Sequence, residues 1–447
     1  MRRAGVLLHP TSLPSGVLDD QVERFLDWME KTGLSVWQML PLAPPHADRS
    51  PYQAYSSHGI NPALLPPELT FRREDEEEFD AFKRTHTKWL TQYSLFVALR
   101  NHYGDRPWYE WPTAFKHHEQ AALDRFAAEH FSAIELLQQK QFLLWRRWKE
   151  IHRDANRRGI QLLGDVPIAV AYDSANVWAN LGLFKLDDEL RPTVVAGVPP
   201  DYFSATGQRW GNPHYNWEAM QRNGFAWWRR RMATALYLFD IVRIDHFRGL
   251  VALWEIPADS PDGRTGQWVP TPGRELLEVL REDFPTMPFV AEDLGLITPE
   301  VTALRDEFNL PGLSVLQFGF DGTADNPHSI YNQKCNTIVY TGTHDNDTSL
   351  GWFESLDSDT QSKVLHQLPA HVGHMPWPLI TAALESCAHT AIIPMQDWLE
   401  LDSRSRTNVP GTTEGNWCWR FEWEQLGQGL EERISSLVQL SGRTQNR

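Results

Sequence analysis

Arg243 and Asp245 stand two residues apart in the stretch Ile-Val-Arg-Ile-Asp-His-Phe-Arg at residues 241–248, which has the β-branched composition of a strand. Residues two apart in a strand share one face, so these two side chains are expected to lie together. A guanidinium close to a carboxyl group lowers the pKa of that group and keeps it ionised. The pattern fits a carboxylate prepared as a nucleophile, and it also fits a structural ion pair.

Two later apolar runs also end in acidic residues. Residues 288–295 reach Glu292 and Asp293 before a glycine, and residues 337–345 end in His344 and Asp345. Carboxylates at the C-terminal ends of different parallel strands converge on one rim, which is how active sites are assembled in (β/α)8 barrels. Three such carboxylates predict an active site. Asp293, next to Glu292, points to the opposite face of a continuing strand, and a structural role is expected for it.

The rest of the chain supplies the elements that such a site needs. Apolar runs between Gly, Pro and polar residues predict eight strands, at 4–9, 36–42, 160–166, 241–246, 288–292, 313–318, 337–341 and 390–394. Helical periodicity predicts helices between and beside them, at 22–31, 74–100, 118–158, 217–238, 274–283, 299–308, 377–386 and 430–440. The sequence therefore predicts an α/β fold, a (β/α)8 TIM barrel.

No linker, repeat or low-complexity tract divides the chain, so a single catalytic domain over residues 1–447 is expected. The long intervals after the second and third strands predict insertion subdomains at about 43–159 and 168–240. Both would form walls around the mouth of the barrel. The segment 247–273, which contains Trp254 and Trp268, either covers the cleft or is a long exposed loop.

Composition narrows the class of ligand. The net charge of −16 argues against nucleic acid, because phosphate binding depends on clustered Lys and Arg. The run Arg229-Arg230-Arg231 is interpreted as a solvated helix face. Some of the 20 tryptophans would stack on the apolar faces of sugars, although most are expected to be core packing.

The cellular setting follows from what the sequence lacks. No stretch is apolar for long enough to span a membrane, and the first nine residues predict a strand and no signal peptide. Cys335, Cys387 and Cys418 are widely spaced and odd in number, which indicates neither a disulfide framework nor a metal site. A cytoplasmic protein without a membrane partner is predicted.

The motifs Arg-Ile-Asp-His-Phe-Arg-Gly, Ala-Glu-Asp-Leu-Gly and Gly-Thr-His-Asp-Asn-Asp-Thr, in this order, resemble the three core motifs of the 4-α-glucanotransferases of glycoside hydrolase family 77. That family belongs to the α-amylase clan. The resemblance implies that Asp245 is the nucleophile, that Glu292 is the general acid/base and that Asp345 holds the hydroxyls of the distorted sugar. In a retaining mechanism the two reacting carboxyl groups lie about 5–5.5 Å apart. Arg243 compensates Asp245, so Glu292 is expected to keep its proton near neutral pH.

The resemblance also implies substrate contacts. Tyr52 lies in a Ser-Pro-Tyr motif and would be a stacking platform, although an isolated Tyr52 or Trp210 would more often be packing. The stretch 197–213 is the most distinctive match and would supply Gln208 and Trp210. The full set of expected substrate-binding residues is Ser50, Tyr52, Asp165, Gln208, Trp210, Arg243, His344 and Asn408.

Three functions remain in view. The first is a glucanotransferase that passes segments of α-1,4-glucan to an acceptor glucose or maltooligosaccharide. The second is an α-1,4-glucan hydrolase with the same carboxylates, which residue identities at the centre do not separate from the first. The third is a non-catalytic glucan-binding protein, which the presence of all three carboxylates disfavours. No cofactor is expected, because the chemistry needs only carboxyl groups.

Overall fold

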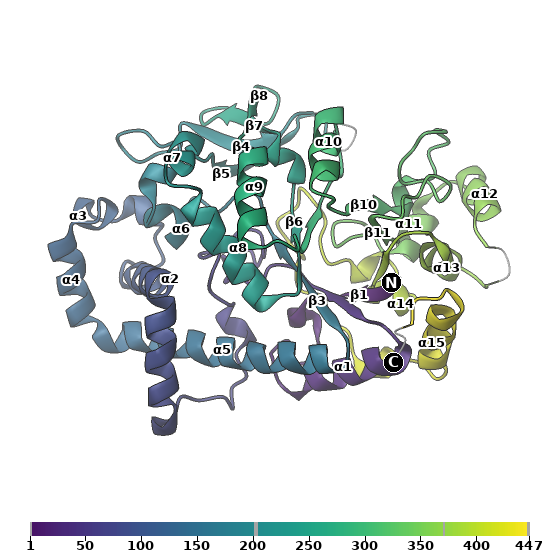
Figure 1. Ribbon diagram of the computed structural model, residues 1–447, viewed down its shortest axis with the longest axis horizontal. Coiled ribbons are helices and arrows are strands. Elements are labelled where there is room, and N and C mark those ends of the chain that lie inside the picture. Colours follow the sequence, from purple (N-terminus) through teal and green to yellow (C-terminus); the bar gives the residue numbers. More distant parts are fainter. Residues whose placement is uncertain (1, 201–203, 370–371, 445–447) are drawn as a thin grey trace.

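Eight parallel strands form the central sheet of the computed structural model, which describes residues 2–200, 204–369 and 372–444 (Figure 1). Their order in the sheet is β10-β11-β12-β1-β2-β3-β6-β9. The bounds are β1 Arg3–Leu7, β2 Val36–Gln38, β3 Gln161–Val166, β6 Ile241–Ile244, β9 Phe289–Ala291, β10 Gly312–Val315, β11 Thr337–Tyr340 and β12 Thr390–Pro394. All eight predicted strands are present, and most of them end a few residues earlier than expected.

The sheet closes into a barrel between β9 and β10. The Ala291 N–H donates to the Pro311 carbonyl at 2.9 Å, and the Leu313 N–H donates to Asp293 Oδ1 at 2.7 Å. The other carboxylate oxygen of Asp293 pairs with Arg305. Asp293 therefore has the structural role expected from its outward position, and the fold is the predicted (β/α)8 barrel.

Side chains alternate between the inside and the outside of the barrel. Leu7, Leu163, Val315 and Ile392 belong to one buried cluster made almost wholly of strand residues, whereas Val6 and other neighbours in the chain pack in the larger cluster with the helices. This period of two is the one expected for strands, and it makes the barrel interior a packed core.

A helix comes after most strands, and capping residues determine where some of these helices begin and end. For example, α1 begins where Asp19 accepts a hydrogen bond from the Gln21 N–H and ends at Gly33, whose φ is 77°. The bounds are α1 Asp20–Thr32, α2 Glu76–His102, α3 Thr113–Lys116, α4 Gln120–Glu129, α5 Phe131–Arg157, α6 Ala175–Trp178, α7 Trp217–Arg222, α8 Ala226–Leu238, α9 Gly273–Asp283, α10 Pro299–Glu307, α11 Ser349–Ser355, α12 Ser358–Gln367, α13 Trp377–Glu385, α14 Met395–Trp398 and α15 Leu430–Leu440.

Two predicted helices are each divided in the structure. Residues 217–238 form α7 and α8, because Gly224 and Phe225 between them both have positive φ, 63° and 53°. Residues 118–158 form α4 and α5, with His130 at the break. Between α7 and α8 the two left-handed residues interrupt the run of i to i−4 hydrogen bonds, and at His130 the run is interrupted with φ at −111°. Periodicity alone reveals neither break.

A second, antiparallel sheet lies beside the barrel, in the order β5-β4-β7-β8 (Figure 1). Its strands are β4 Val194–Val198, β5 Gln208–Pro213, β7 Ala252–Pro257 and β8 Gln267–Pro270. The segment 247–273 is therefore a paired hairpin, not a long exposed loop, and Trp254 faces Trp268 across it with ring centroids 5.2 Å apart. The sheet joins strands of the interval 168–240 to strands that come after β6.

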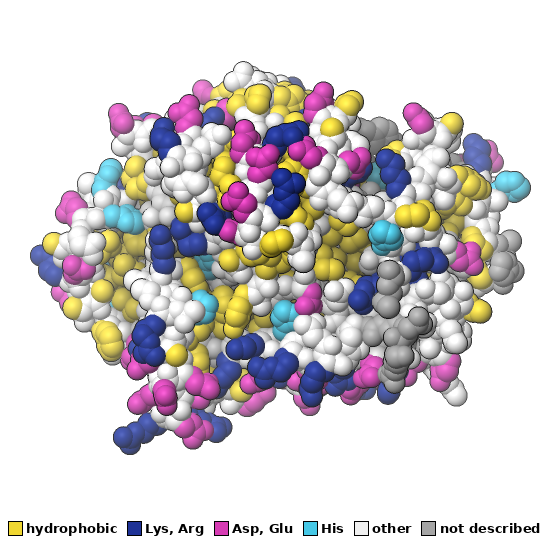
Figure 2. All heavy atoms as spheres, in the orientation of Figure 1, with side chains coloured by type: hydrophobic (Ala, Val, Ile, Leu, Met, Phe, Trp, Pro, Cys, Tyr) yellow, Lys and Arg dark blue, Asp and Glu magenta, His cyan; other side chains and the backbone are white. Residues whose placement is uncertain are grey.

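The surface carries both signs of charge. On the face shown in Figure 2, Lys and Arg side chains alternate with Asp and Glu and form no single basic patch. Among the described residues, no helix combines the length and the apolar character needed to cross a membrane.

Candidate active site

A cleft of about 620 Å³ opens at the C-terminal ends of the barrel strands. Every predicted site residue except Asp165 lines it, and Asp165 lies directly behind Tyr52, whose hydroxyl donates to Asp165 Oδ2 at 2.8 Å. The residues that line the cleft are Ser50, Tyr52, Gln208, Trp210, Arg243, Asp245, Glu292, His344, Asp345 and Asn408. The fold thus brings the whole predicted set to one place.

Asp245 and Glu292 follow two adjacent parallel strands. In the register of β6 and β9, Ile244 pairs with Ala291, so the two carboxyl residues come one position beyond the last pair. The Glu292 N–H still donates to the Ile244 carbonyl at 3.1 Å, so the two strands remain together at this level. Neighbouring strands lie about 4.8 Å apart, which fixes the spacing between the backbones of Asp245 and Glu292.

His246, two residues beyond β6, has a conformation that lets its backbone hold Glu292. Its φ of 52° places it in the left-handed region, which is uncommon for a residue with a side chain. In this conformation the His246 N–H donates to Glu292 Oε2 at 2.6 Å, and the Leu294 N–H donates to Oε1 at 2.9 Å. Both oxygens of the Glu292 carboxyl group are therefore held by the backbone.

Arg243 is a buried cation surrounded by carboxyl groups. One of its nitrogens, Nη1, lies 2.6 Å from Asp165 Oδ2 and 2.9 Å from Asp245 Oδ1. Burial lowers the pKa of Arg243, but the charges of Asp165 and Asp245 outweigh burial, so its pKa is well above the ordinary value. The expected placement of Arg243 beside Asp245 is confirmed. Arg243 also forms an ion pair with Asp165.

Two carboxyl groups of this cluster have raised pKa values. Burial, with the nearby charge of Asp245, raises the pKa of Glu292 to about 7, although Arg243 and the two backbone donors oppose the shift. Burial also raises the pKa of Asp165, and Arg243 again opposes it. Three carboxyl groups around one guanidinium repel one another when they are ionised, which favours the protonated form of the more buried groups. Asp245, whose side chain is 27% exposed, is the accessible member of the cluster.

Asp345 lies in the same cleft, beside its chain neighbour His344 and beside Asn408 of a later segment. Asn408 Nδ2 donates to Asp345 Oδ1 at 2.6 Å, and His344 Nε2 lies 3.4 Å from Asp345 Oδ2. The His344 ring also stacks on Tyr52 at 5.3 Å and lies 3.0 Å from the Tyr52 hydroxyl. Asp345 is half exposed, so its carboxylate is available to a ligand.

Gln208 and Trp210 reach the cleft from the second sheet. Both belong to β5, and the Trp210 indole N–H donates to Gln208 Oε1 at 3.0 Å. The Trp210 ring meets His246 edge to face, with centroids 5.0 Å apart. Residues 201–203 of the distinctive stretch 197–213 lie outside the described residues.

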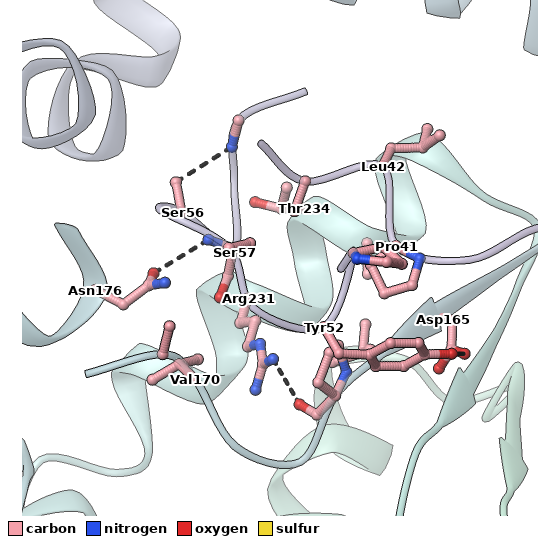
Figure 3. Close-up of a pocket in the computed structure, with 18 of the residues that line it drawn as sticks. Pro41, Leu42, Tyr52, Ser56, Ser57, Asp165, Val170, Asn176, Arg231 and Thr234 are labelled. Atoms are coloured by element: carbon pink, nitrogen blue, oxygen red, sulfur yellow. Dashed lines mark hydrogen bonds between the residues drawn. The ribbon is translucent and has the colours of Figure 1, made fainter. Parts of the chain in front are cut away.

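A smaller cavity of about 50 Å³ lies on the other side of Tyr52 and Asp165 (Figure 3). Arg231 of α8 points into this region, and its Nη2 donates to the Pro167 carbonyl at 2.6 Å, immediately beyond β3. The Tyr215 hydroxyl donates to the next carbonyl, that of Ile168, at 2.8 Å. The expectation that Arg229, Arg230 and Arg231 form a solvated face is therefore wrong for Arg231, which is 3% exposed.

Several cleft residues had no individual prediction. The guanidinium of Arg248 lies 3.5 Å from the centroid of the Trp268 ring, and both residues line the cleft. Trp417 lies 6.1 Å from Tyr52, ring to ring. Arg248 belongs to the same seven-residue motif as Asp245, and this motif was the sequence signal that placed Arg248 near the site. Trp417 reaches the cleft with a φ of 61°, and no periodic pattern indicates this.

The side chains that line the cleft suit proton transfer and nucleophilic attack. Among residues 2–200, 204–369 and 372–444, no group of three or more His, Cys, Asp or Glu side chains is arranged to hold a metal ion. The cleft instead combines an accessible carboxylate beside a cation, a buried carboxyl group with a pKa of about 7, and aromatic rings with amide and imidazole donors. This combination is that of glycoside-cleaving sites.

Known proteins of one family match this chain over 99–100% of its length. The profile of glycoside hydrolase family 77, described as 4-alpha-glucanotransferase, matches residues 8–74 and 68–425. The 4-alpha-glucanotransferase of Synechocystis is 42% identical over 99% of this chain and 98% of its own, and that of Thermus thermophilus is 40% identical over 99% of both. The amylomaltase of Streptococcus agalactiae, solved in complex with acarbose, has a TM-score of 0.94 and 30% identity and covers 100% of both chains. With these matches and a barrel of this kind, the chain belongs to glycoside hydrolase family 77, the 4-alpha-glucanotransferases.

Proposed function

We propose that this protein transfers segments of α-1,4-glucan to glucose or to a maltooligosaccharide by a retaining double displacement. Asp245 attacks the anomeric carbon, and Glu292 protonates the departing oxygen and later deprotonates the acceptor. Asp345 holds the hydroxyls of the distorted sugar. The observation that carries the proposal is the placement of Asp245 and Glu292 directly after two adjacent strands, with Arg243 beside the first carboxyl group and burial around the second.

The strand geometry is compatible with a retaining mechanism. Inverting enzymes leave room for a water molecule, with carboxyl groups about 6.5–9.5 Å apart, whereas retaining enzymes bring them to about 5–5.5 Å. Residues at matching positions of hydrogen-bonded strands have backbones about 4.8 Å apart. Backbones this close allow the two carboxyl groups to reach the retaining distance, which a covalent glycosyl-enzyme on Asp245 requires.

The remaining cleft residues are proposed to bind the glucan. The ring of Tyr52 stacks beneath the sugar at the cleavage point. Asp165 and His344 hold the hydroxyl group of Tyr52 in place. Gln208 and Trp210 bind the donor side, whereas Ser50 and Asn408 complete the walls. No cofactor takes part. The free, exposed thiols of all three cysteines support a reducing, cytoplasmic setting.

Transfer is expected to dominate over hydrolysis. Incubation with maltotriose should give glucose and a ladder of longer maltooligosaccharides, with little net gain in reducing ends. The reason is that a bound acceptor has an effective molarity far above its bulk concentration, and it can therefore compete with water at about 55 M. Chromatography of the products with a reducing-end assay makes the measurement. Glucose and maltose alone, with reducing ends rising in step with bond cleavage, would identify a hydrolase.

The rate should fall on the alkaline side because Glu292 must carry a proton in the first step. Its pKa of about 7 lies above the ordinary value of a glutamic acid. The protonated fraction therefore decreases as the pH rises through 7, and kcat/KM for maltotriose should fall about tenfold per pH unit well above that value. A donor with a fluoride leaving group is the control, because glycosyl-enzyme formation from it should lack this alkaline limb. A maltotriose profile that stays flat from pH 6 to 9 would contradict the assignment.

A further inference from the structure

A cavity of about 260 Å³ lies between α2 and α8, outside the catalytic cleft. One side is a face of α2 that presents Thr85, Lys88, Trp89 and Gln92 at helical spacing. The other is a face of α8 that includes Arg230, Ala233, Thr234 and Tyr237, again at helical spacing. Both helices lie beside α5 in Figure 1, and α5 contributes Trp145 to the lining.

Aromatic rings form much of the wall of this cavity. Trp89 and Trp145 are stacked with centroids 5.4 Å apart, and the ring of Tyr237 lies 5.0 Å from that of Trp145. His86 packs 4.5 Å from Trp145. Tyr237 is 44% exposed, which is unusual for a large ring with so many aromatic neighbours. Flat aromatic surfaces that remain accessible suit the apolar face of a sugar ring.

The charges around the cavity are of one sign, although the chain has a net charge of −16. Lys88 and Arg230 line it, and its lining contains no Asp or Glu. Neither cation forms an ion pair with a carboxylate among the described residues, in contrast to Arg229 beside it, which donates to Asp283 at 2.6 Å. Burial lowers the pKa of Arg230, and no neighbouring anion opposes this effect. A partly buried cation without a counter-ion attracts an anionic ligand.

Neutral polar groups complete the lining. His58 is 8% exposed and its Nδ1 lies 2.8 Å from Thr234 Oγ1. Asn176, Asn180 and Gln92 add amide groups, which both donate and accept hydrogen bonds. Such groups match the hydroxyls of a sugar. Asn176 also lines the small cavity behind Tyr52 (Figure 3), so the two cavities share a wall.

We propose that this cavity binds a hexose monophosphate. The phosphate lies between Lys88 and Arg230, and the ring packs against Trp89 and Tyr237, with the amides on its hydroxyls. The volume of 260 Å³ corresponds to about nine water molecules at ~30 Å³ each. That room suits one ring with one phosphate and is below the ~300–1,000 Å³ typical of pockets for larger ligands. A single phosphorylated sugar is therefore the ligand that fits this volume best.

Isothermal titration of the full chain with glucose 6-phosphate tests this site. A saturable 1:1 isotherm is expected, together with a change in tryptophan fluorescence from Trp89 and Trp145. Arg230→Gln should weaken the affinity by at least ~10-fold, because hydrogen bonds to a charged group are the strong ones. Lys88→Gln, at an exposed position of α2, should also weaken it and provides a second variant if the first is unstable.

Arg229→Gln is the matched control, since Arg229 is the preceding residue of the same helix and pairs with Asp283 outside the cavity. It should bind glucose 6-phosphate as the unmodified chain does. Glucose also binds the catalytic cleft as an acceptor, so glucose and inorganic phosphate are compared by their ability to displace bound glucose 6-phosphate, and each should need at least ~10-fold more ligand than glucose 6-phosphate itself. Equally effective displacement by glucose would overturn the role of the cations. Equally effective displacement by inorganic phosphate would overturn the role of the rings. An unchanged affinity in both Arg230→Gln and Lys88→Gln, or no isotherm at all, would overturn the site.

Discussion

Asp245→Asn is expected to abolish glucan transfer. The amide is not a nucleophile toward the anomeric carbon, so no glycosyl-enzyme forms, and kcat should fall on the order of 10⁵-fold or more, the scale of removing a catalytic nucleophile. The side chain keeps its shape and can still accept a hydrogen bond from Arg243, which lies 2.9 Å from Asp245 Oδ1 in the native chain. Binding of maltooligosaccharide should therefore survive, and the measurement is product formation from maltotriose beside a binding titration.

Asp262→Asn is the control for this substitution. Asp262 pairs with Arg264 in the hairpin beyond β6 and does not line the cleft, so its variant should keep nearly full activity. A second readout is trapping of the intermediate by mass spectrometry, which should label the unmodified chain at Asp245. Retained turnover in Asp245→Asn, or a covalent sugar on another carboxylate, would exclude Asp245 as the nucleophile.

Glu292→Gln is expected to separate the two halves of the reaction. An ordinary glucan needs its leaving oxygen protonated, and loss of a general acid costs roughly 10²–10⁴-fold. Glucosyl fluoride leaves without a proton, so glycosyl-enzyme formation from it should remain fast in the variant. Transfer from the glycosyl-enzyme to the acceptor then stalls because no general base is present, and the glycosyl-enzyme should accumulate. The measurement is the burst of fluoride release, compared with steady-state transfer from maltotriose.

An azide acceptor strengthens this test, because it needs no base and should restore turnover of the fluoride donor by Glu292→Gln. Glu300→Gln, at a position in the first turn of α10 outside the cleft, should behave as the unmodified chain. If Glu292→Gln were as slow in the fluoride burst as with maltotriose, its defect would lie in binding or folding, and the acid assignment would fail.

Most of the barrel could be predicted from the sequence because its signals are local. Apolar runs bounded by turn residues mark strands, and the 3.6-residue period marks helices, so all eight strands and the helix α15 were found. The division of residues 217–238 was missed because it depends on positive φ at Gly224 and Phe225. The sheet β5-β4-β7-β8 was missed for another reason: its strands come from both sides of β6, and pairing between distant segments leaves no periodic trace.

The site divides in a similar way. The sequence by itself determined which carboxylates meet, because Asp245, Glu292 and Asp345 each follow a parallel strand, and parallel strands end on a common rim. It also determined that Arg243 faces Asp245, because a strand has a period of two. The sequence also led to the expectation of a protonated Glu292, but only the tertiary structure decided what raises its pKa. The pKa of Glu292 depends on burial and on two backbone donors from other positions, and Arg243 is shared with Asp165 of a different strand. Desolvation and through-space charge are set by packing in three dimensions, and residue spacing along the chain does not encode them.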